Sequence, residues 1–165
     1  MKVAIIATSL ILSSTSVSYA NSCDFNKQVT ALALNMYHEA RDQGIDGMQM
    51  VGEVTLNRVA NKAFPNNICS VVYQANKDES NNIILHKCQF SWYCDGKPDT
   101  PLESEAWKTA KSLANDMITG KTELYNNNAT HFLNPKIVKN IPNWAKKFTK
   151  VGGVKDHVFF DMDAE

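Results

Sequence analysis

The stretch that decides the fold is QVTALALNMYHEA, residues 28–40. At 100° per residue its apolar side chains fall within one stripe, made of Val29, Leu32, Ala33, Met36 and Ala40. This spacing predicts an amphipathic helix over 28–40 that turns the stripe toward a core. Glu39 sits at the edge of the stripe, within about 20° of Leu32. A carboxyl group in that position calls for an explanation.

Two further helices are expected along the chain. Asp46 is placed to cap the first, with Gln49 completing a capping box, and this helix should end by Phe64-Pro65. Thr100 is placed to cap the second, which Gly120 should stop. Their predicted buried residues are Met50, Val51, Val54 and Val59 in the first, and Ala106, Ala110, Leu113, Ala114 and Met117 in the second.

Extended segments are expected where aromatic or β-branched residues lie between turn formers, over 89–93, 130–133 and 157–160. The polar stretch 76–82 is expected to be a loop. The fold class predicted from these patterns is α+β, mainly α.

The overall composition indicates one globular domain that carries no net charge. The chain has 165 residues, of which 44% are hydrophobic, and its 17 Lys and Arg balance 17 Asp and Glu. A general nucleic-acid binder would need a basic excess, so no nucleic-acid partner is expected. Nothing in the charge favours an anionic membrane surface either.

The first twenty residues read as a secretory signal. Lys2 precedes an apolar run over 3–12, and Ser18-Tyr19-Ala20 offers small residues at a cleavage site. The expected domains are therefore a signal peptide, 1–20, and a mature domain, 21–165, exported to the periplasm or cell wall. An uncleaved N-terminal anchor is the alternative. After signal removal no stable membrane insertion is expected, and the protein is expected to be a monomer.

Four cysteines lie in the mature domain, and an even number in an exported chain favours disulfides. Cys88 and Cys94 enclose only five residues, so we expect these two to pair and Cys23 to pair with Cys69. A zinc site that uses the nearby His86 is the rival, although paired C-x-x-C spacing is missing.

Glu39 has two interpretations. At an apolar margin its carboxyl group would be partly desolvated, which would raise its pKa and suit it to protonate a glycosidic oxygen. Alternatively it is a surface glutamate paired with Arg41 or Arg58. Periodicity alone favours the second interpretation.

The aromatic residues suit a glycan-binding groove, and the alternative is core packing, which explains most aromatic residues in any protein and is expected for Trp107. Sugar rings have apolar faces edged by hydroxyls, and several aromatic side chains lie near amide and hydroxyl groups in the sequence. These are Phe90, Trp92, Tyr93, Trp107, Tyr125, Phe132 and Trp144. His38-Glu39 lacks the second histidine of a zinc-protease helix, because position 42 is Asp.

Several segments, taken together and in order, resemble the SleB/CwlJ-type cell-wall hydrolase family, which includes spore cortex-lytic enzymes. The resemblance runs from about residue 30 to 161. The segments are ALNMYHEAR (33–41), VGEVTLNRV (51–59), ICSVVYQ (68–74), QFSW (89–92), ATHF (129–132), PNW (142–144) and HVFF (157–160).

The resemblance implies a lysozyme-like, mainly α fold and cleavage of the glycan strand of peptidoglycan. It places the family's catalytic glutamate on Glu39, which reverses the order of the two interpretations above. Family members often have Glu-Ala-Arg-Gly-Glu where this chain has Asp42 and Gln43, so no role for a second glutamate is carried over. Asp42 and Glu53 are conceivable partner carboxylates, and Asp42 is expected to face solvent.

We therefore expect a lytic transglycosylase or muramidase that acts on peptidoglycan without a cofactor or metal. The candidate substrate-binding residues are Tyr37, Gln89, Ser91, Trp92, Thr130 and His131. Two alternatives stay open. One is an N-acetylmuramoyl-L-alanine amidase, which would normally need zinc. The other is a non-catalytic exported glycan-binding domain. The sequence does not distinguish a resident bacterial enzyme from a phage endolysin.

Overall fold

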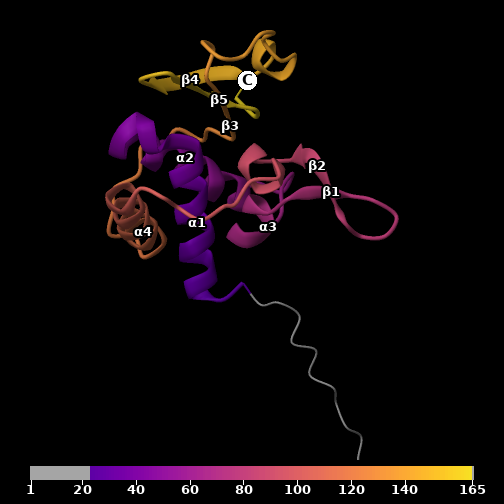
Figure 1. Ribbon diagram of the computed structural model, residues 1–165. Helices are drawn as coiled ribbons and strands as arrows, with labels where there is room; N and C mark the ends of the chain where they lie inside the picture. Colours follow the sequence, from indigo (N-terminus) through magenta and orange to yellow (C-terminus); the bar gives the residue numbers. More distant parts are fainter. Residues whose placement is uncertain (1–22, 165) are drawn as a thin grey trace, which may run out of the picture.

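A computed structural model describes residues 23–164 as a helical body with a small sheet at one end (Figure 1). The predicted signal peptide, 1–20, lies outside the described residues. Helices and strands follow in the order α1 (Phe25–Ala40), η1 (Arg41–Gln43), α2 (Gly44–Ala60), α3 (Ile68–Val72), β1 (Ala75–Lys77), β2 (Ile83–Cys88), η2 (Ser91–Cys94), α4 (Ser104–Ile118), β3 (His131–Leu133), η3 (Trp144–Lys146), β4 (Thr149–Val154) and β5 (His157–Asp161). The predicted mainly α, α+β class is confirmed.

Helix α1 is the centre of the body, because α2, α3 and α4 all pack against it. Four of the five predicted stripe residues are fully buried: Leu32, Ala33, Met36 and Ala40. A Cβ atom on Gly52 of α2 would lie only 2.7 Å from the sulfur of Met36 and 2.8 Å from that of Met117 in α4. Glycine at position 52 therefore allows the three helices to approach closely.

The predicted helix starts are wrong by a few residues. Helix α1 begins three residues before Gln28, where the Asp24 side chain accepts a hydrogen bond from the Lys27 backbone N–H at 2.9 Å. Helix α2 begins at Gly44, with no side-chain cap from Asp46. Gln49 makes no capping box there, because its amide instead donates to the Glu123 carbonyl at 2.7 Å.

Helix α4 starts at Ser104, four residues after the predicted cap Thr100. The Tyr37 hydroxyl holds the two residues just before the helix, since it accepts hydrogen bonds from the backbone N–H groups of Leu102 and Glu103, both at 3.0 Å. The predicted stop is confirmed, because Gly120 has a left-handed φ of 70° just after the helix ends.

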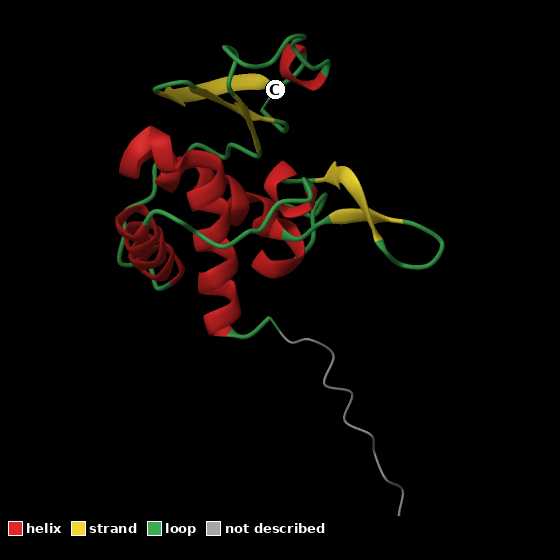
Figure 2. Cartoon of the chain, in the orientation of Figure 1, coloured by secondary structure: helices red, strands yellow, loops and turns green. Residues whose placement is uncertain are grey.

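Two small antiparallel sheets complete the fold (Figure 2). The first is a hairpin of β1 and β2 that projects from the body, so the predicted loop over 76–82 is too long at its start. The second has the order β3-β5-β4 and packs on α2. Strands β3 and β5 confirm the segments predicted over 130–133 and 157–160, whereas 89–93 is largely the turn of 3-10 helix η2.

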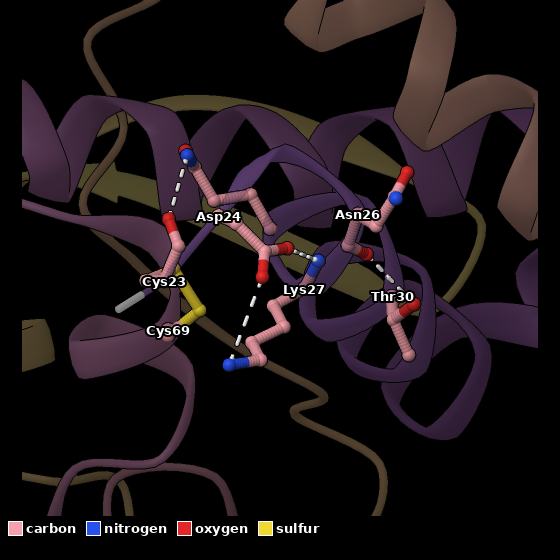
Figure 3. Close-up of polar contacts among 7 residues, drawn as sticks. Cys23, Asp24, Asn26, Lys27, Thr30 and Cys69 are labelled. Carbon is pink, nitrogen blue, oxygen red and sulfur yellow. Dashed lines mark hydrogen bonds and ion pairs between the residues drawn. A yellow bond between two sulfur atoms is a disulfide. The ribbon is translucent and has the colours of Figure 1, made fainter. Parts of the chain in front are cut away.

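Both predicted disulfides are confirmed, Cys23–Cys69 and Cys88–Cys94. This pairing rules out Cys88 and Cys94 as zinc thiolates beside His86. Cys23–Cys69 joins the start of α1 to α3 (Figure 3). Cys88–Cys94 joins the end of β2 to η2. Within residues 23–164, none of the helices has the length and apolar character needed to cross a membrane.

Candidate active site

Glu39 lies where two neighbouring cavities meet, near the C-terminal end of α1. Glu39 and Ser91 line both cavities. The aspartate cavity, of about 410 Å³, is also lined by Tyr37, His38, Arg41, Trp92, Asp95, Lys97, Pro98, Asp99, Thr100 and Leu102. The arginine cavity, of about 300 Å³, is also lined by Arg58, Cys88, Gln89, Phe90, His131, Phe132 and Trp144.

Buried hydrogen bonds fix the wall of the aspartate cavity. Asn35 in α1 is fully buried, and its amide oxygen accepts from the Trp92 indole N–H at 3.1 Å. The amide nitrogen of Asn35 donates to the Thr55 hydroxyl at 3.1 Å, which ties α1 to α2. The Trp92 ring stacks on His38 at 4.7 Å, and Nε2 of His38 lies 3.0 Å from the Asp99 carbonyl oxygen. Sequence reasoning did not anticipate Asn35, whose only signal was a polar residue on a buried helix face.

The arginine cavity combines a buried cation with a neutral histidine. Arg58 in α2 is 3% exposed, and its Nε donates to the Thr130 carbonyl at 2.7 Å. Burial, together with the Arg58 charge, lowers the pKa of His131 to about 4, so this imidazole is uncharged at neutral pH. Trp144 lies against His131 with 5.0 Å between ring centroids.

Burial raises the pKa of Glu39 to about 7, while the nearby Arg58 charge acts in the opposite direction. A substantial fraction of Glu39 therefore carries a proton at neutral pH. The surface pairing considered from sequence is not found, because Arg41 binds Glu103 at 2.9 Å. No ion pair within 4.0 Å joins Glu39 to Arg58.

The structure brings five of the six candidate binding residues to these cavities. Gln89 and His131 line the arginine cavity, Tyr37 and Trp92 the aspartate cavity, and Ser91 both. The sixth residue, Thr130, is only 2% exposed and lies behind His131, whose Nδ1 is 3.0 Å from the Thr130 hydroxyl. Tyr37 is also mostly buried, and its hydroxyl is engaged by the start of α4.

The acidic partners considered from sequence are placed elsewhere. Glu53 is buried and accepts from the Tyr125 backbone N–H at 2.6 Å, so it anchors the chain after α4. Asp42 is exposed, as expected. Gln43, which stands where relatives often have glutamate, is buried, and its side chain accepts from the Asp156 backbone N–H at 3.0 Å. The carboxylates that do share a cavity with Glu39 are Asp95 and Asp99, which sequence reasoning missed.

A further cavity lies away from Glu39, beside the Cys23–Cys69 disulfide, which Figure 3 shows. It measures about 480 Å³ and is lined by Cys23, Asn26, Lys27, Thr30, Cys69 and Tyr73, none of which is a carboxylic acid. Within residues 23–164, no group of three or more His, Cys, Asp or Glu side chains is placed to hold a metal ion.

The carboxyl group of Glu39 thus lies between two polar cavities that aromatic side chains help to line. Comparisons with known proteins identify the class of enzyme. A family model described as Cell Wall Hydrolase matches residues 42–160, and the chain belongs to this family. It is a peptidoglycan-degrading enzyme. The matched range begins three residues after Glu39.

Two solved structures share the fold. One is the catalytic domain of the germination-specific lytic transglycosylase SleB from Bacillus anthracis, at 25% identity and a TM-score of 0.62, covering 86% of this chain and 98% of that one. The other is the catalytic domain of the Bacillus cereus SleB protein, at 21% identity and a TM-score of 0.61, covering 85% and 94%. No curated protein matches the sequence.

Proposed function

We propose that this enzyme cuts the glycan strand of peptidoglycan as a lytic transglycosylase, with Glu39 as its catalytic acid and base. The observation that carries the proposal is the placement of Glu39, whose buried carboxyl group has a pKa of about 7 and lies between two cavities. A group with that pKa can give up a proton and take one back near neutral pH. The likeness to a SleB catalytic domain described as a lytic transglycosylase supports this reaction type.

In the first step, protonated Glu39 donates its proton to the glycosidic oxygen between N-acetylmuramic acid and N-acetylglucosamine. The bond from that oxygen to the anomeric carbon of muramic acid breaks, and the carbon gains oxocarbenium character. The N-acetylglucosamine side leaves with a free 4-hydroxyl group. Glu39 is now a carboxylate.

In the second step, the Glu39 carboxylate takes the proton of the muramic acid 6-hydroxyl. The 6-oxygen then bonds to the anomeric carbon and closes a 1,6-anhydro ring, which returns Glu39 to its protonated form. No water is consumed, and no second carboxylate is needed. The substrate's own hydroxyl is held next to the reacting carbon at high effective concentration.

The residues around Glu39 would bind successive sugars of the strand. Gln89 and Ser91, both exposed, would hydrogen-bond hydroxyl and acetamido groups. Neutral His131 would present its Nε2–H to the substrate, provided that the Thr130 hydroxyl donates to its Nδ1. In this role Thr130 orients His131. Tyr37 and Trp92 would shape the aspartate cavity.

Export remains part of the proposal. Two disulfides and a cell-wall substrate fit an extracellular or cell-wall protein. The predicted signal peptide over 1–20 would deliver the mature domain, 21–165, to the periplasm or cell wall, where it would act as a monomer.

The products of digestion test this function. Sacculi are digested with the enzyme, and the soluble fragments are analysed by mass spectrometry, with Glu39→Gln as the matched control. We expect muropeptides ending in 1,6-anhydro-muramic acid, each lighter by one water than a hydrolysis product. Muropeptides with only reducing muramic acid ends would replace the transglycosylase with a muramidase. Free stem peptides beside intact glycan would indicate an amidase, and no release at all would favour a glycan-binding domain.

A further inference from the structure

Arg58 is a buried cation that one hydrogen bond and two aromatic rings hold in place. Its Nε donates to the Thr130 carbonyl, and its guanidinium carbon lies 5.1 Å from the Phe90 ring centroid and 5.3 Å from that of Phe64. Burial lowers the pKa of Arg58 to about 10, so it still carries its charge at neutral pH. Contacts with two aromatic faces and one carbonyl fix the plane of the guanidinium group.

One nitrogen of this group has no partner. Nη1 of Arg58 is buried and makes no hydrogen bond, one of two such side-chain atoms within residues 23–164. A buried donor without an acceptor costs free energy, and more so on a charged group. Arg58 lines the same cavity as Glu39, yet no ion pair within 4.0 Å joins the two. The structure thus keeps a charged donor unsatisfied close to a carboxyl group.

We propose that Arg58 is the positioning residue for Glu39. Once Glu39 has given up its proton, the Nη1–H of Arg58 donates a hydrogen bond to the Glu39 carboxylate. Arg58 keeps its own proton throughout and contributes a hydrogen bond and a charge. The inference rests on the proposed function. It explains how one glutamate serves first as an acid and then as a base, because the hydrogen bond from Arg58 forms only once Glu39 is an anion.

Other charged groups face Glu39, but they are placed differently. Asp95, Asp99 and Lys97 belong to the chain after η2 and line the aspartate cavity. His38 and Arg41 are neighbours of Glu39 on the α1–η1 segment, and Arg41 is bound to Glu103. His131 of β3 is uncharged. Among these side chains Arg58 is the buried cation, and its charge opposes the effect of burial on Glu39.

The test is the pH profile of kcat for peptidoglycan cleavage in wild type, Arg58→Gln and Arg58→Lys. In wild type, kcat should fall about tenfold per pH unit above about 7, as Glu39 loses its proton. Removing a nearby positive charge raises the pKa of Glu39. In Arg58→Gln the fall in kcat at high pH, the basic limb of the profile, should therefore begin about one pH unit or more higher than in wild type. The kcat of this variant at pH 6 should fall about 100-fold, with KM within about threefold. Lys62→Gln, an exposed charge just after α2, is the matched control and should leave both unchanged.

Arg58→Lys separates the charge from the hydrogen bond. A lysine retains the charge, so the basic limb should stay near pH 7, but it lacks the planar donor and should lower kcat about tenfold. Thermal unfolding of each variant identifies any that does not fold. A folded Arg58→Gln variant with an unshifted limb would overturn the proposal. If Arg58→Gln does not fold, a wild-type kcat in Arg58→Lys would overturn it. An active Glu39→Gln variant would instead refute the proposed function.

Discussion

The two cavities that meet at Glu39 differ in charge and in how tightly their groups are held. In the aspartate cavity the carboxyl groups of Asp95 and Asp99 lie on a polar loop that reaches the surface. In the arginine cavity the cation Arg58 is buried, and Trp144, His131 and Phe132 supply aromatic surface. Both cavities share Glu39 and Ser91, so the difference lies in what each side offers to the same acid.

This difference explains how a single carboxyl group can change its role. Burial keeps the proton on Glu39 before reaction, and the fixed positive charge on one side favours the anion that forms afterwards. If both sides were apolar, Glu39 would be a weak acid that could not release its proton. If both sides were cationic, Glu39 would already be ionised at neutral pH. The asymmetry keeps the pKa near the working pH.

The largest effect is expected from removing the acid that the two cavities share. Glu39→Gln retains size and hydrogen bonding but has no transferable proton, so activity should fall by about 10³-fold or more. Turbidity loss of a peptidoglycan suspension measures the rate, and circular dichroism with thermal unfolding checks the fold. Lysis within threefold of wild type would remove Glu39 from the mechanism.

A smaller effect is expected from the aromatic surface of the arginine cavity. Trp144→Ala should raise KM about tenfold with kcat changed less than threefold, because losing one buried aromatic contact costs roughly 1.5 kcal/mol. Trp107, on α4, lies outside both cavities, so Trp107→Phe is the control. A fall in kcat with an unchanged KM would show that Trp144 acts in the chemical step and not in sugar binding.

Removing each of the two disulfides gives a matched comparison, with a smaller expected effect on activity than Trp144→Ala. Cys88–Cys94 holds the segment that carries Gln89, which lines the arginine cavity, and Ser91, which lines both cavities. Replacing both cysteines by serine should lower activity about fivefold and stability by roughly 2 kcal/mol, given its short loop. Removing Cys23–Cys69, at the other end of α1, should cost more stability and leave activity at low temperature unchanged.

Free-thiol labelling under denaturing, non-reducing conditions provides the reference for this experiment. Wild type should show no reactive cysteine. Two or more labelled cysteines would contradict the pairing, and equal activity losses in the two double variants would mean that the Cys88–Cys94 loop has no special role in the groove.

The sequence was sufficient to predict the parts of the fold that depend on local pattern. The stripe over 28–40 predicts α1, and the short loop predicts Cys88–Cys94, because periodicity and loop length are local properties. Cys23–Cys69 then follows as the remaining pair. The start of α4 could not be predicted, since the residues just before it are held by the hydroxyl of Tyr37, 65 residues from Leu102. The hairpin strand β2 was missed because its Ile83, Ile84 and Leu85 are exposed and show no alternation.

In the candidate site, too, the sequence predicts what depends on local pattern and not what depends on tertiary packing. Glu39 could be singled out as a carboxyl group on an apolar margin and as a match to a family segment. The residues around Glu39 could not be predicted, because they come from separate elements. Arg58 lies on α2, Asp99 follows η2 and Trp144 begins η3. These residues meet only through tertiary packing of α1, α2 and the small sheet. The family's frequent second glutamate is replaced here by Gln43, so no role was carried over, and the structure shows that the Gln43 side chain accepts from the Asp156 backbone N–H.

The smallest effect is expected from Asp99, and it decides whether the two cavities are functionally different. Burial raises the pKa of Asp99, with the neighbouring His38 opposing the shift. A hydrolytic enzyme would need a second carboxylate near the reacting carbon, about 5 to 10 Å from the first, to attack the carbon or activate water. Asp99 and Asp95 are the carboxylates that share a cavity with Glu39.

If Glu39 acts alone, Asp99→Asn should lower the rate less than threefold and leave the products ending in 1,6-anhydro-muramic acid. Asp95→Asn should behave in the same way. If either substitution instead costs about as much as Glu39→Gln, the aspartate cavity supplies the missing carboxylate and the enzyme hydrolyses its substrate. Rate and product analysis on the same digest separate the two cases, because a hydrolytic mechanism changes both and a binding defect changes only the rate.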